Sequence, residues 1–264
     1  RYGQLLEVSV AHGVPASRVG ERVWVWNAAW GRPHGTAAGA VVLPSAQAVP
    51  LPDGVPFDAG ACLGIPAMTA LHALRCDGGV TGQRVLVAGG AGAVGHYAVQ
   101  MARLLGARQV LATVSSEDKA RIAAEAGAHA TIDYKREDLA ARVAELTGGV
   151  GVDRVIEVDA AANMAVDLAL LRPGGRLVVY GSGVPTVEVP FVAAIIKGVA
   201  MRWFIVYELD PDEREAAQAQ LTAWLERGAL VHAVALQLPL AQIAAAHEAV
   251  EGGRVVGNVV LQID

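Results

Sequence analysis

The chain has 264 residues, of which 53% are hydrophobic, and it carries a formal net charge of −5. This length allows one large domain or two modest ones with a sizeable buried core and no need of disulfides. The charges form no basic stripe, which argues against a nucleic-acid-binding surface, so the expected partners are small molecules or copies of the same chain.

The cysteines, the apolar stretches and the opening residues bear on cellular location. Cys62 and Cys76 have neither a C-x-x-C spacing nor the ligand spacing of a zinc site, so we expect packed thiols in a reducing compartment. The longest apolar stretch, 189–206, is interrupted by Lys197 and Arg202, which disfavours a membrane span. No export signal opens the chain, and we expect a cytoplasmic protein.

The first part of the chain predicts a β-rich lobe of short strands and turns. Candidate strands cover residues 22–26, 39–43 and 47–49. The opening RYGQLLEVSV gives this lobe no clean beginning, so we expect the chain to start inside a domain. A helix over 66–74 and a glycine-rich loop over 77–83 then predict a domain boundary.

Residues 84–106 organise the sequence, because they predict a buried strand, a tight turn and a helix with one apolar face. Between the strand and the helix, Gly90, Gly92 and Gly95 have the spacing G-x-G-x-x-G. This spacing permits a tight turn, close approach of a pyrophosphate and close packing of helix on strand, with free helical N–H groups facing the phosphates. We therefore predict dinucleotide binding; the alternative is a glycine-rich turn without a ligand.

Beyond this turn, strands alternate with helices. Strands are expected at 109–114, 130–133, 152–158 and 176–180, and helices at 117–126, 137–147 and 162–171. Gly127 and Gly148 occupy helix C-cap positions, and Pro173-Gly174-Gly175 predicts a turn before the last strand. The alternation predicts an α/β fold with a Rossmann-type, doubly wound parallel sheet.

The last quarter of the chain departs from this alternation. A helix over 211–227 that ends at Gly228, a strand over 234–238, a helix over 240–251 and a strand over 255–263 are expected. We expect this tail to return to the first lobe and to leave a cleft between the lobes for cofactor and substrate.

The end of the second strand bears on the choice of cofactor. Sites for NAD usually carry a carboxylate there, about 20 residues past the glycines, but the strand ends in Val114-Ser115-Ser116. Ser115, Ser116 and Lys119 can surround a 2′-phosphate, so we expect NADPH rather than NADH. The alternative for Lys119 is a solvated helix residue.

Motifs of other chemistries are missing from the sequence. It contains no H-E-x-x-H, no G-x-S-x-G and no G-x-x-x-x-G-K-[ST], and its seven histidines have no ligand spacing. We expect no metal site, and we expect Cys62 not to be a nucleophile, because no partner that would activate its thiol can be named.

Five sequence blocks, in order, carry a resemblance to a known family. They are ACLGIPAMTALHAL, VLVAGGAGAVGHYAVQMARLLGA, IDYKRED, ELTGGVGVDRVIEV and LRPGGRLVVYGSG. The chain resembles the zinc-free quinone oxidoreductases of the medium-chain dehydrogenase/reductase superfamily, the zeta-crystallin-like group. Short-chain dehydrogenases are disfavoured, because Tyr97 lacks a lysine four residues later.

The resemblance implies metal-free, NADPH-dependent reduction of quinones by a two-lobe subunit. Residues 1–65 and 207–264 would form a GroES-like catalytic lobe, incomplete at its N-terminus, and 66–206 the NADPH-binding domain. Ala93 and Val94 would offer N–H groups to the pyrophosphate. Ser115, Lys119 and Tyr134 would contact the adenosine end, and the nicotinamide half would be lined by Thr69, Asp159, Gly181, Ser182, Phe204 and Val206.

Several of these residues also have a plain structural interpretation. Thr69 fits helix packing, Phe204 a buried strand, Tyr134 a rim aromatic and Asp159 a solvated loop acid. The family also lines its acceptor pocket with an Asn and a Tyr from a longer first lobe. Tyr2 is the candidate for that tyrosine. No acid–base residue stands out, so we expect water to supply the proton.

Three functions remain open from the sequence. They are a quinone reductase, an enone or enal reductase on the same scaffold, and a non-catalytic NADPH-binding structural or sensor protein. The resemblance also implies a homodimer that pairs the edge strand of the nucleotide-binding lobe across a two-fold axis.

Overall fold

The computed structural model describes residues 5–7, 13–253 and 255–263. The chain divides into two compact units. We call Thr69–Leu209 the central unit, and Arg1–Met68 together with Asp210–Asp264 the flanking unit.

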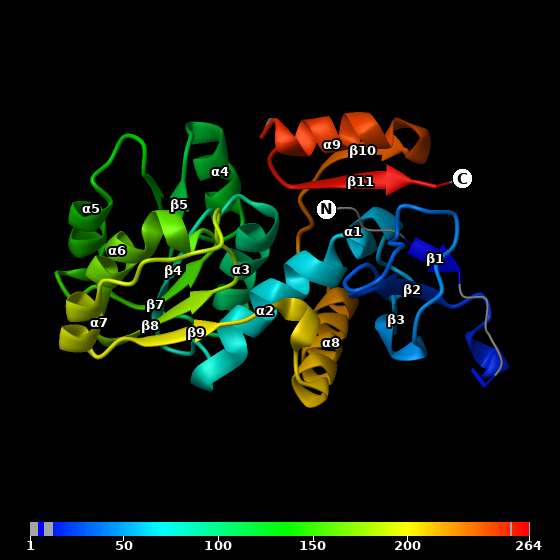
Figure 1. The fold of residues 1–264 in the computed structure, drawn as a ribbon, viewed down its shortest axis with the longest axis horizontal. Helices are drawn as coiled ribbons and strands as arrows, with labels where there is room; N and C mark the ends of the chain where they lie inside the picture. Colours follow the sequence, from blue (N-terminus) through cyan, green and yellow to red (C-terminus); the bar gives the residue numbers. More distant parts are fainter. Residues whose placement is uncertain (1–4, 8–12, 254, 264) are drawn as a thin grey trace. The chain divides into compact units, whose positions relative to one another are not determined.

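The central unit is built on a six-stranded parallel sheet with the order β6-β5-β4-β7-β8-β9 (Figure 1). The strands are β4 (Arg84–Val87), β5 (Gln109–Val114), β6 (Ala130–Asp133), β7 (Val152–Glu157), β8 (Leu171–Val179) and β9 (Ala200–Trp203). Numbered along the chain, this order is 3-2-1-4-5-6, which is that of dinucleotide-binding sheets. The order reverses between β4 and β7, and ligands bind beyond the carboxyl ends of strands at such a point.

Helices cover both faces of this sheet, which confirms the predicted α/β, doubly wound fold. The helices are α2 (Met68–Arg75), α3 (Ala93–Leu104), α4 (Glu117–Glu125), α5 (Leu139–Thr147), α6 (Ala160–Leu170) and α7 (Phe191–Lys197). Helix α3 packs on β4, β5 and α4, whereas α6 packs on β7, β8, α5 and α7. Val85, Leu86 and Val87 of β4 are all buried, as a strand covered on both faces requires.

Two helices of the central unit have capping residues at their ends. Ser116 and Asp138 begin α4 and α5 by accepting hydrogen bonds from backbone N–H groups one turn later. Gly148 ends α5 in the left-handed conformation, and Gly127 follows α4 with a φ of +105°. The C-cap prediction is confirmed for Gly148, whereas the C-cap of α4 is Ala126 and Gly127 is the next residue.

Two predicted features, one in the central unit and one just before it, are wrong in detail. Pro173-Gly174-Gly175 lies inside β8 instead of forming a turn before it. The pairing of β7 with β8 jumps from Val152↔Leu171 to Arg154↔Arg176, so these residues form a bulge. The helix expected over 66–74 begins as a π-helical turn, Leu63–Ala67, because Pro66 has no N–H for a regular helical hydrogen bond.

The flanking unit holds two small sheets and three α-helices in the part of it that the structure describes. Strands β1 (Leu5–Glu7), β2 (Arg22–Val25) and β3 (Ala48–Pro50) form an antiparallel sheet. Strands β10 (Val234–Pro239) and β11 (Asn258–Gln262) form a separate parallel pair. The helices are α1 (Phe57–Ala61), α8 (Pro211–Glu226) and α9 (Ile243–Glu251).

Residues from the two ends of the chain meet inside the flanking unit. Gln237 donates from Nε2 to Oδ2 of Asp58 at 2.6 Å, and the guanidinium of Arg214 lies 5.7 Å from the ring of Trp26. Leu221, Trp224 and Leu225 of α8 are buried, as the amphipathic pattern predicted. The strand predicted at 39–43 is wrong, because no described strand pairs with this segment and Val42 is 92% exposed.

No helix among the described residues is both long enough and apolar enough to cross a bilayer. The apolar stretch 189–206 instead forms α7, β9 and the start of a short 3-10 helix.

Arg154 of β7 is fully buried and ties the end of α2 to the sheet. Its Nη1 donates to the carbonyl oxygens of Ala73 and Cys76, both at 3.0 Å, and to that of Leu74 at 3.3 Å. The carbonyl oxygen of Cys76 also accepts the N–H of Gly79 at 3.3 Å, so the guanidinium adds to the hydrogen bonding of the carbonyls at the helix end.

Replacing Arg154 with Met should therefore lower the free energy of unfolding by about 3 kcal/mol, because buried carbonyl groups lose their donors. Urea denaturation measures this loss. Arg121→Met is the matched control, since Arg121 is exposed and pairs only with Glu125, and it should change stability by no more than about 0.5 kcal/mol. Equal losses in the two variants would contradict this role of Arg154.

Candidate dinucleotide-binding site

The glycine turn between β4 and α3 admits no side chain at two of its positions. A Cβ on Gly90 would lie 2.5 Å from Cβ of Ala112, and one on Gly95 would lie 2.2 Å from the oxygen of Gly89. The N–H of Gly90 donates to the carbonyl of Thr113 at 3.0 Å, which fastens the turn to the end of β5. The spacing of the glycines thus serves close packing, as the sequence predicted.

The start of α3 presents unpaired N–H groups at the carboxyl edge of the sheet. Gly92 is the N-cap residue and has no side chain to accept them. The first helical hydrogen bond runs from the N–H of His96 to the oxygen of Gly92 at 2.8 Å, so the N–H groups of Ala93, Val94 and Gly95 have no acceptor within the helix. Such a terminus binds anions, and a pyrophosphate fits it.

Ser115, Ser116 and Lys119 come together beyond the end of β5. Lys119 donates from Nζ to Oγ of Ser115 at 2.9 Å, and its N–H donates to Oγ of Ser116 at 3.4 Å. All three residues are half-buried, and no carboxylate of the described residues forms an ion pair with Lys119. The group therefore offers one cation and two hydroxyls to an anion.

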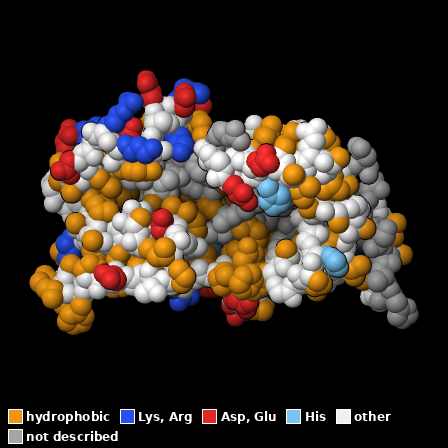
Figure 2. All heavy atoms as spheres, turned by 45° about the horizontal axis from the view of Figure 1, so that its top comes forward, with side chains coloured by type: hydrophobic (Ala, Val, Ile, Leu, Met, Phe, Trp, Pro, Cys, Tyr) orange, Lys and Arg blue, Asp and Glu red, His pale blue; other side chains and the backbone are white. Residues whose placement is uncertain are grey.

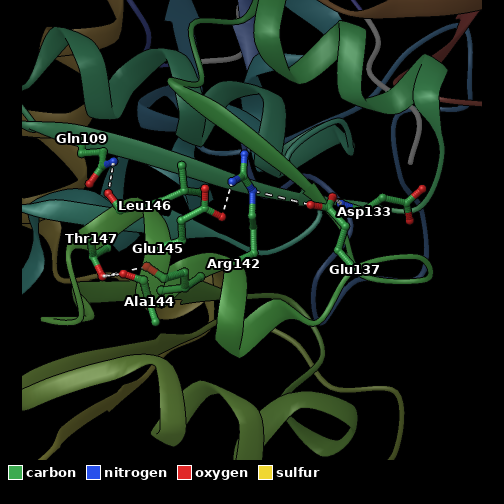
Figure 3. Close-up of polar contacts among 9 residues, drawn as sticks. Gln109, Asp133, Glu137, Arg142, Ala144, Glu145, Leu146 and Thr147 are labelled. Atoms are coloured by element: carbon green, nitrogen blue, oxygen red, sulfur yellow. Dashed lines mark hydrogen bonds and ion pairs between the residues drawn. The ribbon is translucent and has the colours of Figure 1, made fainter.

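Tyr134 lies in a turn that is tightly held beyond the end of β6. Its N–H donates to the carbonyl of Val114 at 3.1 Å, and the N–H of Asp133 donates to Oε1 of Glu137 at 2.7 Å. Figure 3 shows Arg142 beside this turn, with its Nε 3.6 Å from Oε2 of Glu137. The side chain of Tyr134 is 52% exposed, as a rim residue would be.

Figure 2 shows charged side chains of both signs over the part of the central unit that carries α4 and α5. Positive groups there include Lys119 and Arg121 of α4 and Arg142 of α5. Nη1 of Arg121 forms an ion pair with Oε1 of Glu125 at 3.1 Å, and Nη1 of Arg142 forms one with Oε2 of Glu145 at 2.5 Å. Lys119 is the one of these three whose charge has no acidic partner among the described residues.

Two further predicted residues meet beyond β7 and β8. Asp159 precedes α6, and its Oδ1 accepts the N–H of Gly183 at 2.8 Å, so its side chain links the two loops. The N–H of Ala160 donates to the oxygen of Gly181 at 3.1 Å. A Cβ on Gly181 would lie 2.3 Å from the oxygen of Val158, so the close approach of these loops requires glycine. Asp159 thus makes a specific contact instead of being a freely solvated acid.

The remaining predicted residues of the central unit differ in their exposure. Thr69 of α2 is 4% exposed and Val206 is 5% exposed, whereas Ser182 is exposed and donates from Oγ to the carbonyl of Val184 at 2.8 Å. Phe204 is half-buried, and its ring centroid lies 4.5 Å from that of His72. Tyr2, the acceptor-pocket candidate, lies outside the described residues.

Neither the cysteines nor the possible metal ligands form a reactive site among the described residues. Both cysteines are free and buried, and burial, assisted by Asp58, raises the pKa of the Cys62 thiol to about 12. Such a thiol stays protonated and unreactive at neutral pH. Within the described residues, no three side chains of His, Cys, Asp or Glu are grouped so as to hold a metal ion.

Sequence reasoning missed three polar residues beneath this site. Glu157 ends β7 with 0% exposure, Asp167 of α6 is 3% exposed, and Asn163 donates to Glu157. The sequence does mark two of them, since Glu157 ends an apolar strand and Asp167 interrupts an apolar helix. Ionisable side chains in such segments need a partner when they are buried.

The chain is similar to known dehydrogenases and reductases. The family described as "Zinc-binding dehydrogenase" matches residues 93–223. The chain is 33% identical over 213 residues to human quinone oxidoreductase, which is 80% of this chain and 64% of that protein, less than two thirds of its length. It is 32% identical to the quinone oxidoreductase of Pseudomonas aeruginosa over 258 residues, which is 96% of this chain and 78% of that protein.

The chain belongs to the quinone oxidoreductase family of the medium-chain dehydrogenase/reductase superfamily. The chain is also 33% identical to the 2-haloacrylate reductase of a Burkholderia species, over 96% of this chain and 77% of that protein.

Solved structures of other proteins share this fold. The quinone oxidoreductase of Pseudomonas syringae superposes with a TM-score of 0.86 at 29% identity, over 98% of this chain and 81% of that one. A mycobacterial protein solved in complex with NADPH superposes with the same TM-score at 30% identity, over 98% and 80%.

Proposed function

We propose that this protein binds NADPH and reduces a quinone by hydride transfer, without a metal. The observation that carries the choice of cofactor is the Lys119–Ser115 pair at the end of β5, where a site for NAD would place a carboxylate. A lysine and two hydroxyls suit a 2′-phosphate, and the free N–H groups of Ala93 and Val94 suit the pyrophosphate. Membership of the quinone oxidoreductase family supports quinone as the acceptor.

The residues of this chain would act by binding and orientation. The start of α3 and the group around Lys119 would hold the phosphates, and Tyr134 would contact the adenosine end. Asp159, Gly181, Ser182, Thr69, Phe204 and Val206 would line the nicotinamide half. When bound, NADPH supplies the hydride, and we expect the proton to come from water. A quinone is electrophilic enough that close positioning suffices without a Lewis acid.

Reduction of an activated alkene is the second candidate. The observation that favours it is the similarity to the Burkholderia 2-haloacrylate reductase, which extends over 96% of this chain. An enone or enal accepts a hydride at carbon in the same way, so the two candidates need the same cofactor site and differ in the acceptor.

The deciding measurement follows the oxidation of NADPH and NADH side by side, with 1,4-benzoquinone, with an enal and without an acceptor. Rapid oxidation of NADPH with benzoquinone is the expected result. A preference for the enal would instead support alkene reduction. If NADPH binds, by its fluorescence, but neither acceptor is reduced, the result would favour the third candidate, a non-catalytic NADPH-binding protein.

The charge reversal Lys119→Glu should weaken NADPH binding by roughly 1.5–3 kcal/mol, because a charged hydrogen bond to the 2′-phosphate is lost, and should hardly affect NADH. Fluorescence titration with both cofactors measures the difference. Arg121→Glu, on the same helix, is the control and should leave the ratio of the two dissociation constants unchanged. Equal weakening of NADPH and NADH binding by Lys119→Glu would contradict the proposed contact of Lys119 with the 2′-phosphate.

We also propose that a second copy of this chain pairs with β9, which is the edge strand of the sheet (Figure 1). Exposed apolar side chains gather on α7 and β9, and a monomer rarely leaves such a patch uncovered. They are Phe191, Val192, Ile195, Ile196 and Trp203, from 45% to 78% exposed.

Light scattering at micromolar concentration should therefore give a dimer. Ile196→Glu should shift it toward monomer, because a charge would be buried at the interface. Val42→Glu, which alters an apolar residue of the flanking unit that is 92% exposed, should leave the dimer intact. A monomeric wild-type protein would contradict the proposal.

A further inference from the structure

A buried carboxylate lies directly beneath the loops assigned to the nicotinamide half. Glu157 is the last residue of β7 and is completely buried. Its Oε1 accepts the N–H of Asp159 at 2.5 Å and Nδ2 of Asn163 at 2.9 Å. A buried carboxylate that accepts two hydrogen bonds holds its donors strongly in place.

The second oxygen of Glu157 faces another acid. Neither Oε2 of Glu157 nor Oδ2 of Asp167 has a hydrogen-bonding partner among the N–H and O–H groups of the described residues. Burial, and then the charge of Glu157 and a hydrogen bond to it, raise the pKa of Asp167 to about 9. At neutral pH Asp167 therefore keeps its proton and donates it to Glu157, so the pair carries a single negative charge.

Through Asp159, Glu157 is linked by hydrogen bonds to a second loop, the one that follows β8. Asp159 is the N-cap residue of α6, yet its carboxylate accepts the N–H of Gly183 instead of one from its own helix. Glu157 holds the backbone of Asp159, and the side chain of Asp159 holds the loop after β8. A shift of Glu157 therefore moves both loops at the carboxyl edge of the sheet.

We propose that Glu157, held by Asp167, is a positioning residue that fixes the loops after β7 and β8 for the nicotinamide half of the cofactor. This role rests on the proposed binding of NADPH. It concerns the nicotinamide end only, since among the described residues the groups at the start of α3 and around Lys119 form no hydrogen bond with this acid pair.

Because Asp167 is titratable, the contact between Glu157 and Asp159 should depend on pH. The folded-state pKa of Asp167 is raised above the ordinary value of 3.8, so its contribution to stability is complete below pH 3.8 and is lost as the pH rises through about 9. Above that pH the two carboxylates repel each other, and the contact of Glu157 with Asp159 weakens. The loops would then hold the nicotinamide half less well.

Other charges on the elements packed against α6 and β7 have their own partners. On α7, Lys197 donates to carbonyl oxygens at the end of α6, and on α5, Arg142 pairs with Glu145. Arg84 of β4, Asp153 and Arg154 of β7, and Arg172 and Arg176 of β8 lie nearer the amino ends of their strands. Among charged groups, only Glu157 shifts the pKa of Asp167.

The test uses two probes, NADPH and adenosine 2′,5′-bisphosphate, which lacks the nicotinamide half. Their dissociation constants are measured between pH 7.5 and 9.5 for the wild type, Glu157→Ala, Asp167→Asn and the control Asp153→Asn. Asp153 lies at the other end of β7, where it accepts the N–H of Arg84 and pairs with Arg172. Melting temperatures of the four proteins without ligand report on folding.

At pH 7.5, Glu157→Ala should weaken NADPH about tenfold and leave the bisphosphate within about twofold. In the wild type the NADPH dissociation constant should rise severalfold toward pH 9.5, whereas the constant for the bisphosphate should change less. Asp167→Asn should abolish that extra rise, because its amide donates to Glu157 at every pH. Asp153→Asn should behave as the wild type in binding.

Equal weakening of both probes by Glu157→Ala, or an NADPH profile that Asp167→Asn leaves unchanged, would overturn the positioning role. If Glu157→Ala fails to fold, the profile of Asp167→Asn decides alone. A wild type that binds the bisphosphate but not NADPH, or neither probe, would overturn the proposed function itself and this role with it.

Discussion

The close contact between the turn after β4 and the end of β5 is the constraint on which the central unit depends. Gly90 is hydrogen-bonded to Thr113 and lies where any side chain would collide with Ala112. This contact sets α3 against the sheet with its first N–H groups at the carboxyl edge, next to the reversal of strand order between β4 and β7. Ser115, Tyr134, Asp159 and Gly181 lie at the same edge because each follows the end of a parallel strand.

The polar residues at the two ends of β7 support different parts of the central unit. Near the amino end of β7, Asp153 holds the N–H of Arg84 and pairs with Arg172, while Arg154 adds to the hydrogen bonding at the end of α2. At its carboxyl end, Glu157 supports the loop that bears Asp159. Polar residues are buried at both ends, but only those at the carboxyl end lie under loops that would meet a ligand. Burial of a charge on this strand is therefore not by itself a sign of function.

Much of the central unit could be predicted from sequence, because its signals are local. Apolar runs of strand length and cap residues such as Gly148 mark the elements, and the glycine spacing marks the turn. Features that depend on distant partners could not be predicted in this way. The 39–43 segment has strand-like residues but no strand beside it, and the bulge in β8 depends on its register with β7. The pairing of Glu157 with Asp167 likewise needs the packing of α6 on β7.

The strand order also has a consequence for synthesis on the ribosome. One edge of β4 pairs with β5, which follows soon after it, but the other edge pairs with β7, which is made only after β5, β6 and three helices. The carbonyl of Ala73 cannot accept its hydrogen bond from Arg154 until that residue, 81 positions later, has been synthesised. Until then the nascent sheet has an exposed apolar edge of the kind that recruits wrong strands. The central unit can close correctly only once the chain through β7 has emerged from the exit tunnel.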